Sequence, residues 1–428
     1  MLTFRGCCLC VFLAAVTNAV ARGDNWPQWR GASHNGICLE TEVPVRFSKT
    51  ENLAWRLPLP NRAGSTPIVW DDRIFLTSPA KDDDTLLLIC ASTAGKVLWQ
   101  KGIGKGNKNA REIEGNSAAP SPSTDGKHVW AFVGTGILGC YDFDDNEVWK
   151  FDVQSRYGKL VIQFGMTSTP LLDGDRLYLQ LIHGDGDAKT REATIVCLDK
   201  STGNEIWRQP RPSEAYNENE HSYASPTLYR DGDKAFLLTH GADYIVAHRL
   251  DDGREVWRSG GLQPDKYNST LRLVASPVAV PGLIVAPSAK EGRLIAIDPN
   301  GAGDITNSRY VLWSFVPTPD VPSPLIVGDL VYLFRENSVL ICLDAKTGKK
   351  QYEHRLASTE KNRASPLYAA GNIYLAARNG IITVVKAGRQ FEQVWQTDLD
   401  ESIASSPVIA NGRLYLRTND ALWAFGSK

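Results

Sequence analysis

The chain has 428 residues and a formal net charge of −1, with 36 Gly, 23 Pro and 12 Trp. This balanced charge, with basic residues scattered along the chain, gives no electrostatic basis for binding nucleic acid or an anionic membrane. A chain of this length usually forms two or three domains, but an internal repeat overrides that expectation.

Residues 1–21 have the pattern of a secretory signal peptide. Arg5 precedes the apolar run from Cys7 to Val16, and Ala19-Val20-Ala21 offers a small-x-small cleavage site. The apolar run is too short to span a bilayer, which favours cleavage over anchoring. We therefore expect export to the periplasm or the exterior, with no transmembrane segment after cleavage.

Residues 22–51 precede the repeats and contain two closely spaced tryptophans, Trp26 and Trp29. Such a pair could form an exposed aromatic binding patch. The spacing favours a segment that docks on the following domain as a packed cap.

The repeated unit is clearest from Ser168 to Trp207. It contains four short β-rich runs, at 168–172, 176–179, 193–199 and 205–207, separated by Asp/Gly turns. This is the pattern of an antiparallel four-stranded meander. One meander cannot bury both of its faces, so it needs neighbours of the same kind.

The start of this unit recurs along the rest of the chain. A Ser-Pro or Thr-Pro pair marks each start, and the starts are 41 to 56 residues apart, with prolines at Pro67, Pro122, Pro170, Pro226, Pro277, Pro324, Pro366 and Pro407. This is close to the length of a propeller blade. The sequence therefore predicts an all-β fold, an eight-bladed β-propeller of four-stranded antiparallel blades over residues 52–428.

The eighth repeat contains only three runs before the chain ends. Residues 52–56 read as an unassigned fourth strand, so we expect this N-terminal strand to complete the last blade and remove a free sheet edge. The alternative is that residues 52–56 form a loop before an incomplete ring.

Five cysteines remain after the predicted signal peptide. Four of them, Cys90, Cys140, Cys197 and Cys342, occupy the same strand position in different blades, and Cys38 lies before the repeats. Equivalent positions on separate sheets are too far apart for disulfides, so we expect small buried apolar side chains. No Cys/His spacing resembles a zinc site.

The connections differ in length between the two rims of the predicted ring. The turns between first and second strands are short, whereas the connections between blades are long and polar, for example 101–118 and 208–223. Long irregular loops on a rigid scaffold are common binding sites. We call the rim formed by the inter-blade connections and the loops between second and third strands the working face.

Residues just before each blade start should run from the working face into the central channel. These binding candidates are Glu114, Asn116, Gln163, Glu220, His221, Arg272, Lys361, Arg363 and Glu401. Such a ring of charges could hold a polar ligand or a peptide segment, or its members could be merely solvated in a pore. No Ser/His/Asp set or metal-ligand spacing is present, so the sequence predicts no catalytic residues and no metal site.

The repeat resembles the tryptophan-docking repeat of pyrroloquinoline quinone (PQQ) propellers, most clearly at Val196 to Trp207. Residues 25–31, 303–306 and 319–325 also resemble secreted PQQ-like propellers of planctomycete bacteria. The resemblance implies that the tryptophans at the ends of fourth strands dock one blade on the next, namely Trp55, Trp99, Trp149, Trp207, Trp257, Trp313 and Trp395.

Two groups share this repeat: quinoprotein alcohol dehydrogenases, and non-catalytic propellers such as the subunit of the outer-membrane assembly machinery. The resemblance to the dehydrogenases would imply PQQ held against an adjacent-cysteine disulfide, with Ca²⁺. The only adjacent pair, Cys7-Cys8, lies in the predicted signal peptide. We therefore expect a monomeric, non-catalytic protein-binding scaffold of the cell envelope without a cofactor; the alternative is a divergent PQQ- and Ca²⁺-dependent dehydrogenase.

Overall fold

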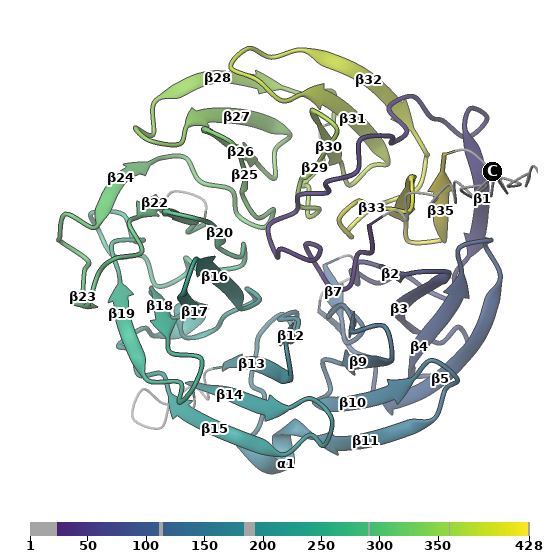
Figure 1. Cartoon of the computed structure of the whole chain (residues 1–428), viewed down its shortest axis with the longest axis horizontal. Coiled ribbons are helices and arrows are strands. Elements are labelled where there is room, and N and C mark those ends of the chain that lie inside the picture. Colours follow the sequence, from purple (N-terminus) through teal and green to yellow (C-terminus); the bar gives the residue numbers. More distant parts are fainter. Residues whose placement is uncertain (1–23, 111–113, 184–192, 290–291, 359, 427–428) are drawn as a thin grey trace, which may run out of the picture.

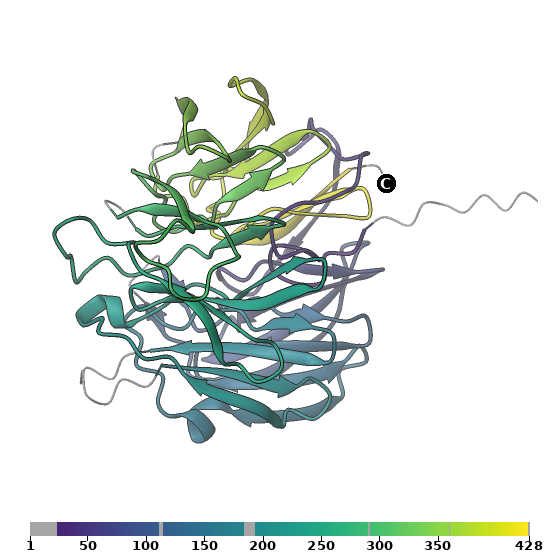
Figure 2. The same ribbon diagram turned by 60° about the vertical axis from the view of Figure 1, so that its left-hand side comes forward.

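The computed structural model describes residues 24–110, 114–183, 193–289, 292–358 and 360–426. The predicted signal peptide, 1–21, lies outside the described residues. The chain forms eight antiparallel sheets arranged as blades around a central axis, and the predicted eight-bladed propeller is confirmed (Figure 1). Figure 2 shows the same ring more nearly from the side.

The first four blades follow one another along the chain, each with its first strand innermost. Blade 1 contains β2 (Ile68–Trp70), β3 (Arg73–Pro79), β4 (Thr85–Ser92) and β5 (Val97–Lys105). Blade 2 contains β8 (Ser123–Thr124), β9 (His128–Phe132), β10 (Ile137–Asp142) and β11 (Glu147–Asp152). Blade 3 contains β12 (Leu171–Asp173), β13 (Arg176–Ile182), β14 (Ala193–Asp199) and β15 (Glu205–Pro210). Blade 4 contains β16 (Thr227–Asp231), β17 (Lys234–Gly241), β18 (Tyr244–His248) and β19 (Glu255–Ser259).

The other four blades complete the ring. Blade 5 contains β20 (Val278–Val280), β21 (Leu283–Ala286), β22 (Leu294–Ile297) and β24 (Val311–Phe315). Blade 6 contains β25 (Leu325–Val327), β26 (Leu330–Phe334), β27 (Val339–Asp344) and β28 (Lys350–Arg355). Blade 7 contains β29 (Leu367–Ala369), β30 (Asn372–Ala376), β31 (Ile381–Lys386) and β32 (Gln393–Asp398). Blade 8 contains β33 (Val408–Ala410), β34 (Arg413–Arg417), β35 (Ala421–Phe425) and β1 (Leu53–Pro58).

A few short elements lie in the connections. They are the hairpin strands β6 (Asn109–Ala110) and β7 (Gly115–Asn116), the strand β23 (Gly303–Asp304), the helix α1 (Val153–Tyr157) and the 3-10 helix η1 (Asn217–Glu220).

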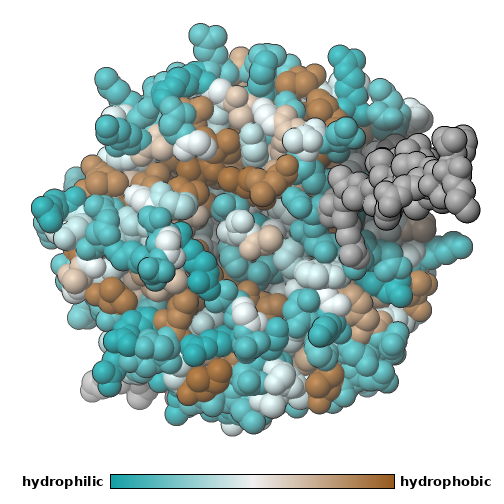
Figure 3. All heavy atoms as spheres, viewed as in Figure 1, coloured by the Kyte–Doolittle hydropathy of each residue, from teal (hydrophilic) through white to brown (hydrophobic). Residues whose placement is uncertain are grey.

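Burial differs between the middle and outer strands of a blade. In blade 6 every residue of β26 is buried, whereas most of β28 is exposed. A middle strand is covered on both faces by the neighbouring blades, and this explains its uninterrupted apolar sequence. The surface seen in Figure 3 is correspondingly hydrophilic over most of its periphery.

The Ser-Pro and Thr-Pro pairs have a structural role beyond marking blade starts. The hydroxyl residue of each pair donates its backbone N–H to the side-chain hydroxyl of the equivalent residue in the next blade, at 2.9 to 3.2 Å. These hydrogen bonds form a closed ring around the channel, through Thr66, Ser121, Thr169, Ser225, Ser276, Ser323, Ser365 and Ser406. We call these eight residues the hydroxyl ring.

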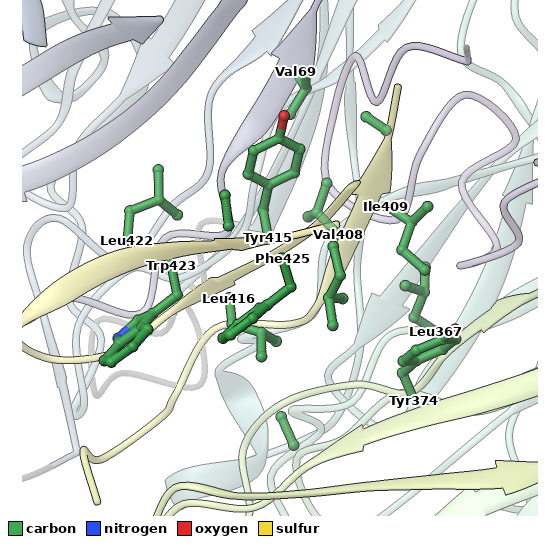
Figure 4. Packing of buried hydrophobic residues seen from close by; sticks show 14 of the residues in the cluster. Val69, Leu367, Tyr374, Val408, Ile409, Tyr415, Leu416, Leu422, Trp423 and Phe425 are labelled. Carbon is green, nitrogen blue, oxygen red and sulfur yellow. The ribbon is translucent and has the colours of Figure 1, made fainter. Parts of the chain in front are cut away.

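The ring of blades is closed by the N-terminal strand, as predicted. Strand β1 pairs antiparallel with β35, with Arg56 opposite Trp423 and Leu57 opposite Leu422. Figure 4 shows how the blade 8 core packs toward Leu367 and Tyr374 of blade 7 and toward Val69 of blade 1. Residues 52–56 therefore do not form a loop before an incomplete ring.

The predicted docking tryptophans lie between neighbouring blades. Six of them donate the indole N–H to a carbonyl at 2.8 to 3.1 Å; the pairs are Trp55–Thr93, Trp99–Phe143, Trp149–Lys200, Trp207–Leu250, Trp313–Ala345 and Trp395–Phe47. In the other pairs the carbonyl lies in or beside the turn between the third and fourth strands of the next blade. Blade 8 has no such turn, because its fourth strand is β1, and the carbonyl of Phe47, which precedes β1, takes this role.

Trp257 departs from this pattern. Its indole N–H is buried and has no hydrogen-bond partner among the described residues. The reason lies in blade 5, where an insertion containing β23 replaces the usual tight turn between third and fourth strands. Strand β23 pairs in parallel with β19, with Gly303 opposite Trp257.

Residues 25–38 cross one end of the channel and contact several blades. Trp26 exchanges both backbone hydrogen bonds with Val69 of blade 1. The Gln28 amide pairs with the backbone of Leu172 in blade 3. The buried Arg30 guanidinium donates to the Pro366 carbonyl at 2.9 Å and to the Pro324 carbonyl at 2.6 Å. This segment is a packed cap, and the crossing chain is visible in Figure 1.

Candidate functional site

A cavity of ≈ 690 Å³ occupies the centre of the propeller on the working face. Residues at the junctions between the inter-blade connections and the first strands line this cavity, and they include all eight members of the hydroxyl ring. Each of these hydroxyls accepts a backbone N–H, which leaves its own O–H able to donate into the cavity. We call this space the central cavity.

Trp29 forms the floor of the central cavity. Trp29 belongs to the cap segment and lines the cavity. Its neighbours Gln28 and Arg30 donate to the backbone carbonyls of Leu172 and Pro366, which lie beyond the hydroxyl ring, toward the rim with the short turns. Trp29 therefore lies at the end of the channel opposite the working face. The N-terminal cap thus gives the channel a floor on this side.

One ion pair crosses the mouth of the central cavity. Arg363, just before blade 7, donates from Nε to Glu114 Oε2 at 3.0 Å and from Nη2 to Oε1 at 2.9 Å. Glu114 lies just before blade 2, so this bidentate pair spans blades 8 and 1. Burial opposes ionisation of Glu114, but the hydrogen bonds and charge of Arg363 hold the pKa of Glu114 below its ordinary value.

A second ion pair lies on the side of blades 4 and 5. Arg272 Nη1 donates to Glu218 Oε2 at 2.7 Å, and its guanidinium carbon lies 4.6 Å from the centre of the Phe164 ring. Tyr223 packs against Phe164 and lines this wall, and its hydroxyl is buried. Burial raises the pKa of Tyr223 to about 12. This wall therefore combines an aromatic surface with a neutral hydroxyl.

Lys361 is the exposed cation of the cavity wall. It makes no ion pair or hydrogen bond with any of the described residues, so its ammonium group can bind an incoming anionic group. Acidic side chains lie nearby on the side of blade 6, where the backbone N–H of Asp320 donates to Glu336 Oε2 at 3.2 Å. The cavity thus presents both signs of charge.

Of the nine predicted binding residues, the structure places Glu114, Arg272, Lys361 and Arg363 around the central cavity. Asn116 lines a neighbouring cavity, and its amide holds the backbone, donating to the Arg62 carbonyl at 2.7 Å. Gln163 is exposed and does not line the central cavity.

Glu220, His221 and Glu401 also lie outside the lining of the central cavity. Glu220 and His221 are buried beside each other, 3.7 Å apart between Oε1 and Nε2, and burial lowers the pKa of His221. Glu401 is occupied within blade 8, where it accepts hydrogen bonds from Arg56 and from the Trp423 indole. The expectation that residues before a blade start enter the channel is therefore wrong for these side chains.

Several lining residues were not among the candidates. Glu218 lies three residues before the candidate His221 and accepts a hydrogen bond from Arg272. A search for charge partners of Arg272 near His221 could therefore have found it. Glu336 lies in the loop between β26 and β27, which also reaches the working face. The close spacing of Trp26 and Trp29 drew attention to Trp29, but its place in the cavity lining depends on contacts between the cap and distant blades, which no local pattern encodes.

Comparisons with known proteins agree with this architecture. The PQQ-repeat family model described as outer membrane protein assembly factor BamB matches residues 134–310. This chain is an eight-bladed β-propeller whose residues 134–310 are similar to the PQQ-repeat family. BamB of Burkholderia pseudomallei is 29% identical over 100 residues, which are 23% of this chain and 25% of that protein. The match thus spans only about a quarter of the length of the curated relative.

Two solved structures are similar over most of their length. BamB from Moraxella catarrhalis superposes with a TM-score of 0.57 and 15% identity, covering 82% of this chain and 96% of that chain. A europium-containing methanol dehydrogenase superposes with a TM-score of 0.71 and 12% identity, covering 94% and 98%. Identities this low establish the shared fold alone. Within the described residues, no helix is long and apolar enough to cross a membrane.

The lining residues can be tested against the PQQ and Ca²⁺ that the dehydrogenase resemblance implies. Among the described residues, no three His, Cys, Asp or Glu side chains converge to hold a metal ion. The five described cysteines are buried, unpaired and distributed over separate strands or the cap. The described cysteines therefore do not form the adjacent-cysteine disulfide that the dehydrogenase resemblance implies.

Proposed function

We propose that this PQQ-like propeller is an exported, monomeric scaffold of the cell envelope that binds a protein partner through the mouth of the central cavity. The similarity to the BamB family supports a role in protein assembly, because the matching model and relatives are assembly factors by description. Export rests on the predicted signal peptide of residues 1–21.

The observation that carries this proposal is the arrangement of charge at the cavity mouth. Two arginine–carboxylate pairs hold positive and negative groups on different sides, and the exposed Lys361, which has no ion-pair partner among the described residues, adds a further cation. Partly exposed charges of both signs give specificity and faster association rather than chemistry. The hydroxyls and the aromatic wall supply further contacts for a polypeptide segment.

Site-specific photo-crosslinking in the cell envelope tests the proposal. A photoreactive amino acid replaces Thr270, an exposed residue that lines the cavity. We expect a discrete adduct with one protein, and Lys361→Glu should reduce its yield severalfold by reversing the unpaired charge. Lys346→Glu is the matched control, because Lys346 is exposed in the turn between β27 and β28 on the opposite rim. The absence of an adduct, or an equal loss in both variants, would contradict the proposal.

A divergent quinoprotein dehydrogenase is the second candidate. It rests on the resemblance of the repeat, clearest at Val196 to Trp207, to the repeat of quinoprotein alcohol dehydrogenases. The described cysteines do not form the adjacent-cysteine disulfide that this resemblance implies. A cofactor titration, described below, separates the two.

A further inference from the structure

The side chain of Glu114 divides two cavities on the working face. A second cavity of ≈ 500 Å³ lies on the side of blades 7, 8 and 1. Glu114 and Gly115 line both this cavity and the central cavity. Because the Glu114–Arg363 pair spans blades 8 and 1, it forms part of the wall between the two spaces.

Glu114 is surrounded by more positive than negative charge. Besides Arg363, its carboxylate lies within electrostatic reach of Lys361 and Arg378. Arg378 is only 8% exposed and lines the second cavity, where Arg62 also lies. Burial and then the neighbouring Arg363 lower the pKa of Arg378. Three cations thus act on Glu114, while Arg62, Glu360 and Asp400 also line the second cavity.

The contact between Glu114 and Arg363 has the geometry of ligand recognition. Two guanidinium nitrogens grip both carboxylate oxygens, which is the arrangement by which arginine recognises a carboxylate from any source. The two side chains remain 30% and 16% exposed. Both side chains are therefore partly accessible to solvent and to an external anion.

We propose that Glu114 is an internal occupant of a carboxylate-binding subsite formed by Arg363, Arg378 and Lys361, and that an acidic segment of the protein partner displaces it. This inference rests on the proposed function and specifies the partner's chemistry. With Glu114 displaced, the two cavities join into one groove across blades 7, 8 and 1. An extended segment then lies in the groove with an acidic side chain on Arg363.

The test compares the binding of labelled hexaglutamate and hexaglutamine peptides by fluorescence anisotropy. In Glu114→Gln the internal competitor loses its charge, so hexaglutamate should bind on the order of tenfold more tightly than to the wild type. Glu392→Gln is the matched control, because it removes the same charge from an exposed outer position, 62% accessible. It should leave the affinity unchanged. Hexaglutamine should bind neither variant more tightly.

A double variant locates the effect. Lys361→Gln in the Glu114→Gln background should reverse most of the gain, because Lys361 is the exposed cation of the subsite. Equal hexaglutamate affinity in wild type and Glu114→Gln, or an equal gain in Glu392→Gln, would overturn the inference.

The same variants keep this result separate from the proposed function. If Glu114→Gln leaves hexaglutamate binding unchanged while Lys361→Glu still reduces the yield of the Thr270 adduct severalfold, the scaffold function stands and the displaceable carboxylate is wrong. If both effects are absent, the proposed function fails as well.

Discussion

His248 should make the folded protein sensitive to mild acid. The ring is 2% exposed; its Nδ1–H donates to the Gly253 carbonyl at 3.0 Å, and its Nε2 accepts from the Thr239 hydroxyl at 2.9 Å. The Thr239 hydroxyl in turn accepts from the buried guanidinium of Arg211 at 3.0 Å. A proton on Nε2 would break this chain and place a second buried cation near Arg211. Burial and Arg211 accordingly lower the pKa of His248 from 6.5 to about 4.

The sign of the effect follows from proton binding. Below pH 6.5 the unfolded chain takes up a proton at this histidine while the folded protein does not, so stability falls with pH through the window from 6.5 to about 4. At about 1.4 kcal/mol per pH unit, the loss across this window is about 3 kcal/mol. His240, which is fully buried with a pKa lowered to about 3, adds a loss of the same sign.

Urea unfolding followed by tryptophan fluorescence at several pH values measures this loss. His248→Gln removes the titrating group, so its stability should fall less steeply with decreasing pH than that of the wild type. His354→Gln is the matched control, because solvent reaches that ring on β28 in the folded protein. Parallel curves for wild type and His248→Gln would refute the reasoning.

Two further predictions concern the contacts between blades. Gly348→Ala should lower the free energy of unfolding in urea by clearly more than Gly371→Ala. Both glycines have a positive φ. At Gly348 the added Cβ would lie 2.7 Å from the Trp313 ring, whereas at Gly371 it would meet nothing within 4 Å. The left-handed conformation alone costs an alanine about 1–2 kcal/mol, so equal effects of the two substitutions would refute blade docking at this position. Ser276→Ala removes the acceptor for the buried N–H of Ser225 and should lower the free energy of unfolding by about 1–3 kcal/mol, whereas Ser276→Thr keeps the hydroxyl. An alanine variant as stable as the wild type would show that the hydroxyl ring contributes nothing.

The fold could be predicted from the sequence because its signals are local and repeated. Each blade carries its own turns and its own Ser-Pro or Thr-Pro start. Blade 8 lacked a fourth strand in the C-terminal repeat, and residues 52–56 were the unassigned strand-like segment that could supply it. The residues of the hydroxyl ring belong to the same Ser-Pro and Thr-Pro pairs. Their hydrogen bonds depend on the spacing between inner strands of neighbouring blades, and the sequence of a single repeat does not specify that spacing.

The site was predictable only in part. Arg272 and Arg363 were chosen because they precede a blade start, where the chain enters the channel. Both side chains line the central cavity. Position alone could not show that Glu401 would be held by Arg56 and Trp423 inside its own blade. The partnership of Glu114 with Arg363 joins residues 249 apart in sequence, and no local pattern encodes it.

The most direct test of the scaffold account is a calorimetric titration of residues 22–428, without the predicted signal peptide, with PQQ in the presence and absence of Ca²⁺. The account predicts no heat of binding and no shift of the thermal unfolding midpoint under either condition, because a protein-binding scaffold requires no cofactor. Micromolar or tighter binding that requires Ca²⁺ would contradict the account and favour the dehydrogenase alternative.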